Sequence, residues 1–223
     1  MTKMAIYYNF VSSNKNIYGE NIMTEKNANI IMDFMSYIKS ADTENFIKGM
    51  LYCFSAPTIK GIKAASLINF RRRKGENIRS LWIEHADEWL SPFGLEWLLL
   101  GEHSDDSALV LVYRRGLLAK ALGCDKACGI LRSKGYPLHD VDACLECLRG
   151  KFCSGFPHEI GLFLDYPPDD VKGFIEDRSA ENLACPGYWK VYGNPDEARK
   201  IFNEYRKAEC EAALLIMAGH SAK

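Results

Sequence analysis

The sequence predicts an α+β fold in which a small, mainly antiparallel sheet packs against several helices. Two apolar runs, LEWLLLG at 95–101 and ALVLVYR at 108–114, flank the polar turn EHSDDS and predict an antiparallel hairpin. The run GYWKVYG at 187–193 predicts a further strand near 187–192, because its side chains alternate between two faces. Elsewhere the apolar residues recur at helical spacing. With 223 residues, of which 48% are hydrophobic and 26% charged, the chain can bury a core of its own.

Three helices are predicted before the hairpin. The first begins near Thr24, the second begins at Thr43, and the third follows the basic run RRRKG and ends before Pro92. The apolar positions that define these helices are Ile31, Phe34, Met35 and Ile38, then Phe46, Ile47, Met50, Leu51 and Phe54, then Ile78, Leu81, Trp82 and Trp89. Pro57 and Gly61, in SAPTIKGIK, predict an interruption between the second helix and the third.

Short helices are predicted after the hairpin over Gly116–Leu122, Lys126–Ser133 and Leu138–Arg149. A further helix through HEIGLFLD has to end at Tyr166, because the proline that follows disfavours helical geometry there. Pro168 can open the next helix, since proline is tolerated in the first turn.

The last predicted helix has the clearest start in the chain. Asn194 suits the N-cap, Pro195 suits the first helical position, and Asp196 and Glu197 favour the positive end of the helix dipole. The apolar side of this helix is formed by Ala198, Ile201, Phe202, Tyr205, Ala208 and Ala212.

Residues 1–23 differ from the rest of the chain, since they are rich in asparagine and have no helical period. We expect them to form a disordered extension, or to be a mis-annotated start with translation beginning at Met23. Residues 24–223 are then expected to form a single α+β domain.

Charge and hydropathy exclude several classes of protein. The 28 Lys and Arg residues and the 29 Asp and Glu residues give a net charge of -1, so nucleic acid is not the expected partner. The basic run Arg71–Lys74 is typical of a solvated loop. No apolar run is long enough to cross a bilayer, and the N-terminus lacks the features of a signal peptide, so we expect a cytoplasmic protein with reduced cysteines.

His158 and Glu159 are candidate ligand-binding residues at the start of the apolar run IGLFL. Adjacent side chains on a helix point about 100° apart, so the pair is not expected to act on one atom. A zinc-protease helix would also need a second histidine at position 162, where the chain has leucine. The simpler interpretation is that Glu159 stabilises a helix start. The alternative is that His158 acts as a ligand or an acid–base group.

The segment SAPTIKGIK is a second candidate site. The hydroxyls of Ser55 and Thr58, together with Lys60 and Lys63, could hold an anion such as phosphate or carboxylate. No G-x-x-x-x-G-K-[ST] loop is present, so a nucleoside triphosphate is not expected. The simpler interpretation is a capped turn between two helices.

The aromatic run GYWKVYG is a third candidate site. Its alternation places Tyr188, Lys190 and Tyr192 on one face and Trp189 on the other. Aromatic faces can stack on bases, flavins or haem, although an aromatic strand more often packs against its neighbours.

Clustered cysteines are a candidate metal site. Cys124 and Cys128 form a Cys-x3-Cys pair, and Cys144 and Cys147 form a Cys-x2-Cys pair. Such spacings are used by zinc and iron–sulfur sites, because two sulfurs can reach one ion. However, both pairs fall on or beside predicted helices, and reduced cysteine is also a common core residue.

The stretches FPHEIGLFLDYPPDDVKGFIED and CPGYWKVYGNPDEARKIFNEYRK resemble the DUF3793 family of uncharacterised bacterial proteins. This resemblance is strongest from Phe156 to Tyr205, and weaker echoes cover 55–67 and 108–122. It implies kinship but no activity. Family members often carry cysteine where Ser55 stands, so a reaction that required that thiol would be absent from this chain.

Three functional hypotheses follow. The first is a non-enzymatic accessory or ligand-binding protein that takes a small ligand or a protein partner. The second is a metal-linked or redox-linked protein that binds zinc or iron through the clustered cysteines. The third is an enzyme that uses His158 or Glu159 as an acid–base group, although no nucleophile or second acid stands at a recognisable spacing from them.

Overall fold

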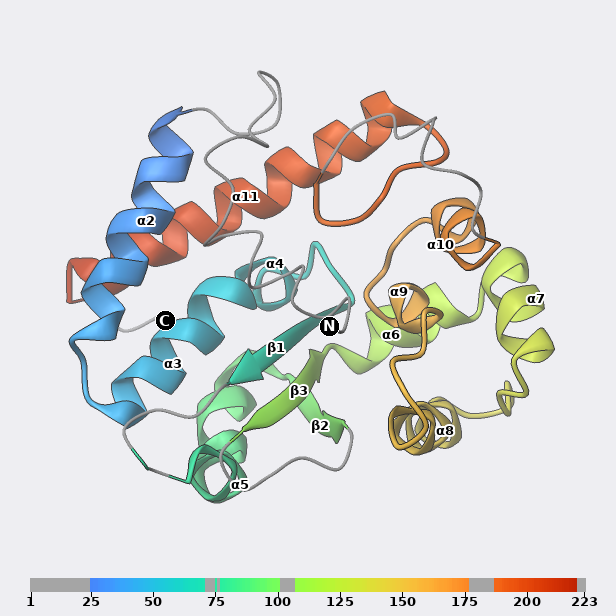
Figure 1. Cartoon of the computed structure of the whole chain (residues 1–223), viewed down its shortest axis with the longest axis horizontal. Coiled ribbons are helices and arrows are strands. Elements are labelled where there is room, and N and C mark those ends of the chain that lie inside the picture. Colours follow the sequence, from blue (N-terminus) through green and yellow to red (C-terminus); the bar gives the residue numbers. More distant parts are fainter. Residues whose placement is uncertain (1–24, 71–74, 76, 101–106, 177–186, 220–223) are drawn as a thin grey trace.

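The computed structural model describes residues 25–70, 75, 77–100, 107–176 and 187–219 (Figure 1). In chain order its elements are α2 (Glu25–Lys39), α3 (Thr43–Phe54), α4 (Ala56–Ile59), β1 (Ala65–Phe70), α5 (Ile78–Leu90), the 3-10 helix η1 (Ser91–Phe93), β2 (Glu96–Leu100), β3 (Ala108–Tyr113), α6 (Arg115–Leu122), α7 (Asp125–Ser133), α8 (Val141–Phe152), α9 (Ile160–Phe163), α10 (Pro168–Ile175) and α11 (Pro195–Met217). The α+β prediction is confirmed.

The sheet has three antiparallel strands in the order β1-β3-β2. Strands β2 and β3 form the predicted hairpin, and Tyr113 of β3 is the register partner of both Glu96 and Ala65. The prediction of a strand near 187–192 is wrong, because those residues form a loop. The third strand is instead β1, over residues for which no strand was predicted.

Helices cover both faces of the sheet, so the central strand β3 is buried along its whole length. Val110 and Val112 point into a core formed with α2, α3 and α5, whereas Leu109 and Leu111 point into a core formed with α6, α8 and α9. Figure 1 shows these two groups of helices on opposite sides of the strands. A strand that is buried on both faces reads as continuously apolar, which explains the run ALVLVY.

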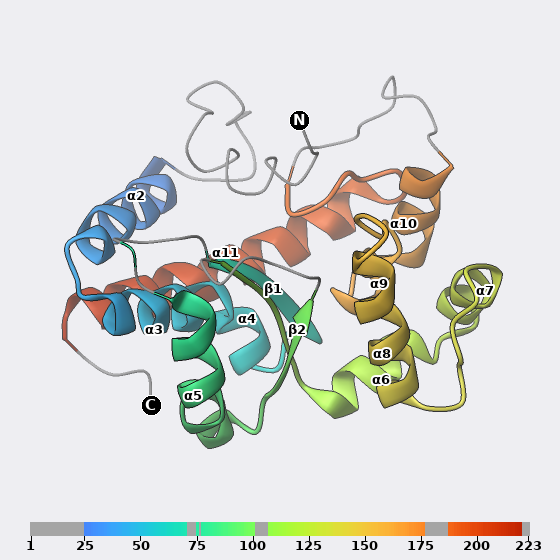
Figure 2. The same cartoon turned by 60° about the horizontal axis from the view of Figure 1, so that its bottom comes forward.

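The long helix α11 runs across the molecule from the side of α10 to the side of α2 (Figures 1 and 2). It begins as predicted, because the Asn194 side chain accepts hydrogen bonds from the backbone N–H groups of Asp196 and Glu197. The helix packs against α2, α3 and α4, and its buried residues include Phe202, Tyr205 and Glu209. A carboxylate on this apolar face was not expected.

Two predictions lie outside the described residues: the extension 1–23 and the basic run Arg71–Lys74. Within the described ranges, no helix combines the length and the apolar character needed to cross a membrane.

Candidate functional site

Lys63 is a buried cation in the turn between α4 and β1. Only 5% of its surface is exposed. The chain reverses at Gly61, whose φ of 71° is readily adopted by glycine, and β1 begins two residues after the lysine. The turn is held from the β3 side, because the Arg114 backbone N–H donates to the Ala64 carbonyl at 2.9 Å and the Arg114 Nη2 donates to the Ile59 carbonyl at 3.0 Å. Lys63 therefore lies below the surface, in a turn that is hydrogen-bonded to Arg114.

Three tyrosine rings surround the Lys63 ammonium. Its Nζ atom lies 5.2 Å from the ring centre of Tyr205, 5.6 Å from that of Tyr166 and 5.9 Å from that of Tyr188. These rings come from α11, from the turn after α9 and from the loop at 187–193, which are distant in sequence. Tyr205 is buried, whereas Tyr166 and Tyr188 are half-buried and form the outer wall. The faces of aromatic rings attract cations, so the three rings form a cage for the amine.

Glu209 is a buried carboxylate beside this cage, with 3% of its surface exposed. Its Oε2 atom accepts hydrogen bonds from the Tyr188 hydroxyl at 2.7 Å and from the Arg206 Nη1 at 2.9 Å. Burial raises the pKa of Glu209, while the Arg206 charge and the Tyr188 hydrogen bond act in the opposite direction. This carboxylate is therefore already bonded to two donors.

Burial lowers the pKa of Lys63 to about 8, although the negative charges of Glu209 and Asp165 act to raise it. The Asp165 carboxylate accepts a hydrogen bond from the Ala64 backbone N–H at 3.2 Å. Among the residues that the structure describes, no carboxylate lies within ion-pairing distance of the Lys63 amine, and no hydrogen bond satisfies it. A buried ammonium without these partners is costly, so its proton is easily lost.

Asp170 of α10 positions the loop that carries Tyr188. Its carboxylate accepts three hydrogen bonds, from the Trp189 Nε1 at 2.7 Å and from the backbone N–H groups of Tyr192 and Gly193, both at 2.6 Å. This loop also requires glycine at 187, since a Cβ atom there would lie 2.0 Å from the Phe202 ring. The backbone donors bond to a side chain rather than to a neighbouring strand, which is why this segment is a loop.

The residues predicted in SAPTIKGIK separate into two groups. Ser55 and Thr58 are buried; the Thr58 and Ser66 hydroxyls are hydrogen-bonded to each other at 2.9 Å, and the Ser55 hydroxyl has no partner in the described part of the chain. Lys60 is exposed and forms an ion pair with Glu211. Lys63 alone of the four enters the tyrosine cage. The expected capped turn between two helices is wrong, because Ser55 makes no side-chain capping bond at α4 and the segment leads into strand β1.

Tyr188, Trp189 and Lys190 have three different roles. Tyr188 forms a wall of the cage. Trp189 is buried and stacks on Tyr166, with ring centres 4.7 Å apart, so it supports the cage from behind. Lys190 is exposed and lies over the Phe174 ring at 5.7 Å.

His158 and Glu159 diverge, as expected from their adjacent positions. His158 is exposed and contacts the Phe174 ring edge-on, with centroids 5.0 Å apart. Glu159 is buried and accepts a hydrogen bond from the Tyr136 hydroxyl at 3.1 Å. Glu159 stands at the N-cap of α9, where its side chain makes no capping bond, so its expected stabilisation of the helix start through the dipole stays a prediction. Neither residue reaches the tyrosine cage by any of these contacts.

The clustered cysteines do not converge on one ion. Cys128 donates its thiol hydrogen to the Leu122 carbonyl at 3.3 Å, and Cys144 is buried and donates to the Pro137 carbonyl at 3.1 Å. Cys124 is exposed, and Cys147 is partly buried one turn after Cys144 on α8. In the described ranges, no three His, Cys, Asp or Glu side chains are grouped so that they could hold a metal ion. These residues therefore do not form the four-thiolate zinc or iron site that their spacing suggested.

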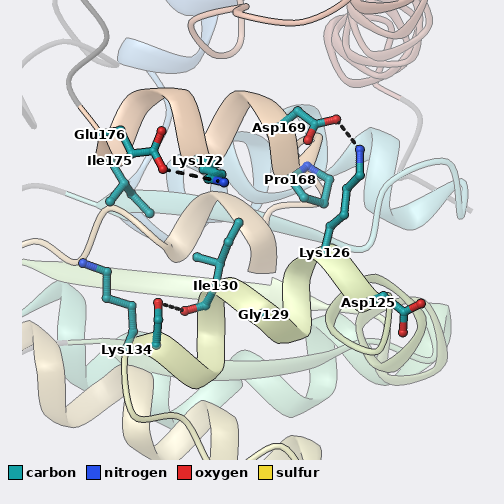
Figure 3. A pocket seen from close by; sticks show the side chains of 11 residues that line it. Asp125, Lys126, Gly129, Ile130, Lys134, Pro168, Asp169, Lys172, Ile175 and Glu176 are labelled. Carbon is teal, nitrogen blue, oxygen red and sulfur yellow. Dashed lines mark hydrogen bonds and ion pairs between the residues drawn. The ribbon is translucent and has the colours of Figure 1, made fainter.

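A groove of about 390 Å³ lies between α7 and α10 (Figure 3). Its charged residues are mostly paired, since Lys126 contacts Asp169 at 2.6 Å and Lys172 contacts Glu176 at 3.7 Å. None of the residues predicted to bind a ligand lines it. The groove is a surface feature lined by residues of α7 and α10, and it shares no residue with the tyrosine cage.

A family comparison covers most of the chain, including the cage. The family described as "Protein of unknown function (DUF3793)" matches residues 51–223. The chain belongs to the DUF3793 family. Lys63 and its tyrosines all lie within the part that matches DUF3793, as does Glu209. No curated protein and no solved structure matches the chain.

Five residues of the site were not predicted from the sequence: Tyr166, Asp170, Tyr205, Arg206 and Glu209. One sequence feature could have pointed to Glu209. It follows Tyr205 by four positions and therefore falls on the apolar side of α11. A carboxylate on an apolar helix face needs a donor or a cation from elsewhere in the fold. The identity of that partner depends on tertiary packing, which the spacing does not reveal.

Proposed function

We propose that this protein is a non-enzymatic, cytoplasmic ligand-binding protein, and that the tyrosine cage around Lys63 is its binding site. The ligand is a small molecule with a carboxylate or phosphate group, which Lys63 holds by its charge. The observation that carries this proposal is the buried Lys63 amine, for which the described residues supply no ion pair. An anionic ligand would supply the missing partner.

The carboxylates of the chain near Lys63 already have other partners, which supports a bound anionic ligand as the partner of Lys63. Glu209 is engaged by Tyr188 and Arg206, and Asp165 is engaged by the Ala64 N–H group. A buried unpaired charge costs several kcal/mol, which a fold would avoid by using an apolar residue if stability alone mattered. The free thiols of the cysteines in the described ranges fit a reducing compartment.

Isothermal titration with sodium acetate and, separately, with inorganic phosphate tests this proposal. We expect saturable binding of at least one of the two probes to the wild-type protein, and at least a tenfold loss of affinity in Lys63→Met. Lys60→Met is the matched control, since it removes an exposed, paired lysine three residues earlier. Equal affinity in wild type and Lys63→Met, or no binding of either probe to the wild type, would overturn the proposal.

A further inference from the structure

The structure places a buried amine and a hydrogen-bonded tyrosine–glutamate pair in one cluster. The Lys63 Nζ lies among the rings of Tyr166, Tyr188 and Tyr205, and the Tyr188 hydroxyl is bonded to the Glu209 carboxylate at 2.7 Å. An amine can act as a nucleophile only in its unprotonated form. No described carboxylate pairs with this amine to hold its proton, and burial favours its neutral form.

We propose that Lys63 captures a small oxo acid, a molecule with a carbonyl group beside a carboxylate, by forming a reversible imine. This inference rests on the proposed function, because it names the class of ligand that occupies the same cage. Acetate or phosphate would then be partial mimics that share only the anionic group.

The step balances without any oxidant or reductant. The Nζ lone pair attacks the carbonyl carbon and forms a C–N bond, while the carbonyl oxygen takes up a proton and becomes a hydroxyl. The C–O bond then breaks, and the oxygen leaves as water after it receives a second proton. The nitrogen gives up one of its two protons after the attack and retains the other, so a single added proton balances the step and the products are a protonated imine and water. We expect the Glu209–Tyr188 pair to supply and receive these protons, because the Glu209 charge acts on Lys63 and Tyr188 is hydrogen-bonded to Glu209.

The surroundings of Lys63 favour such a product. Tyr205 is buried and Trp189 closes the space behind Tyr166, so the side chain is shielded from bulk water that would hydrolyse the imine. The protonated imine keeps the positive charge of the lysine, which the three ring faces and the ligand's own carboxylate stabilise. The half-buried rings of Tyr166 and Tyr188 form the outer wall, so we expect the ligand to enter from their side.

Reductive trapping tests the inference. The full-length protein is incubated with pyruvate and sodium cyanoborohydride, which reduces an imine to a stable secondary amine, and the labelled lysine is located by peptide mass spectrometry. We expect one reduced pyruvyl group per chain, located on Lys63, with at least a tenfold lower label on the exposed Lys60. Lactate, which has no carbonyl group, should leave no label. Label distributed over exposed lysines, with none enriched at Lys63, would overturn the inference.

Two variants make the result specific. Lys63→Arg keeps the charge but cannot form the imine, so its label should disappear, while Lys60→Arg should keep the label of the wild type. If Lys63→Arg does not fold, the ratio of label between Lys63 and Lys60 in the wild-type protein decides the question alone. Saturable binding of acetate or phosphate that depends on Lys63, without trapping by pyruvate, would overturn the imine and leave the proposed function standing. Failure of both would overturn both.

Discussion

The lysines of the groove between α7 and α10 and the lysine of the tyrosine cage have opposite environments. Lys126 and Asp169 in the groove are paired at 2.6 Å, with 67% and 63% of their side chains exposed (Figure 3). Lys63 is 5% exposed and faces ring surfaces in place of a carboxylate. The two sites contain the same side chain but differ in burial and in pairing.

This contrast distinguishes charged side chains that cost the fold little stability from one that destabilises it. An exposed ion pair gains little and costs little, because water screens its charges. A buried ammonium without a counterion destabilises the folded chain, because it loses its hydration. A residue that lowers stability is best explained by a function, so this contrast favours Lys63 over the groove as the functional site.

Asp170→Ala and Asp169→Ala compare a buried carboxylate with its exposed neighbour. Removing Asp170 leaves the Trp189 Nε1 and two backbone N–H groups without their acceptor, so we expect the free energy of unfolding to fall by about 4 kcal/mol. Asp169→Ala should leave it unchanged within error, because that side chain is exposed. Urea denaturation of both variants measures the difference. Equal effects would show that Asp170 does not hold the Tyr188 loop.

Lys63→Met tests how much the buried amine lowers the free energy of unfolding and how that loss varies with pH. The pKa of Lys63 is lowered from 10.5 to about 8, so between these values the unfolded chain binds a proton that the folded chain does not. The loss in free energy of unfolding that is caused by burying Lys63 is therefore complete below pH 8, and it disappears as the pH rises through 10.5. We expect Lys63→Met to be more stable than wild type at pH 7 by up to about 3 kcal/mol, with the difference shrinking at alkaline pH.

The measurement is the free energy of unfolding of both proteins from pH 7 to pH 10.5. Tyr166 and Tyr205 have a pKa raised by burial, so they stay protonated over this range in the folded state. Their contribution is present in both proteins and cancels in the difference. A difference that does not vary with pH would mean that Lys63 does not titrate abnormally.

Tyr188→Phe and Tyr205→Phe compare two rings of the same cage. Both variants keep the aromatic face, but only Tyr188→Phe removes a hydrogen bond to Glu209. We expect Tyr188→Phe to lower the free energy of unfolding by about 1 kcal/mol and to raise the pKa of Glu209 further. Tyr205→Phe should change stability by less than about 0.5 kcal/mol, since no described residue is bonded to its hydroxyl. A larger loss in Tyr205→Phe would contradict this assignment.

Local signals in the sequence predicted much of the fold. The start of α11 depends on Asn194 and the residues next to it, so its capping was readable from four consecutive letters. The hairpin was predicted because both strands and their turn are adjacent in the chain. The strand prediction at GYWKVYG was wrong because the hydrogen-bond partner of this run is not adjacent to it in the chain. Its alternation predicts an extended segment, but its hydrogen-bond partner is Asp170, a side chain on another element.

The candidate site was predicted only in part. Lys63 and Tyr188 were identified separately, one as an anion-binding lysine and one as an aromatic face, and the structure brings them together. Glu209 and Tyr205 belong to a helix far along the chain, so their place beside Lys63 follows from the packing of α11 against α4. The cysteine spacing failed as a metal signal because helices α7 and α8 direct the thiols to separate carbonyls. Spacing along a chain does not determine convergence in space.

The central claim is that Lys63 is a buried amine without a counterion among the described residues, and its side-chain pKa tests that claim most directly. The protein labelled with ¹³C at the lysine ε-carbon is titrated by NMR, and the Lys63 signal is assigned by its absence from Lys63→Met. We predict a midpoint near pH 8 in the ligand-free protein. A Lys63 midpoint at the ordinary lysine value of 10.5 would contradict the account, because it would place the amine in water or beside a carboxylate.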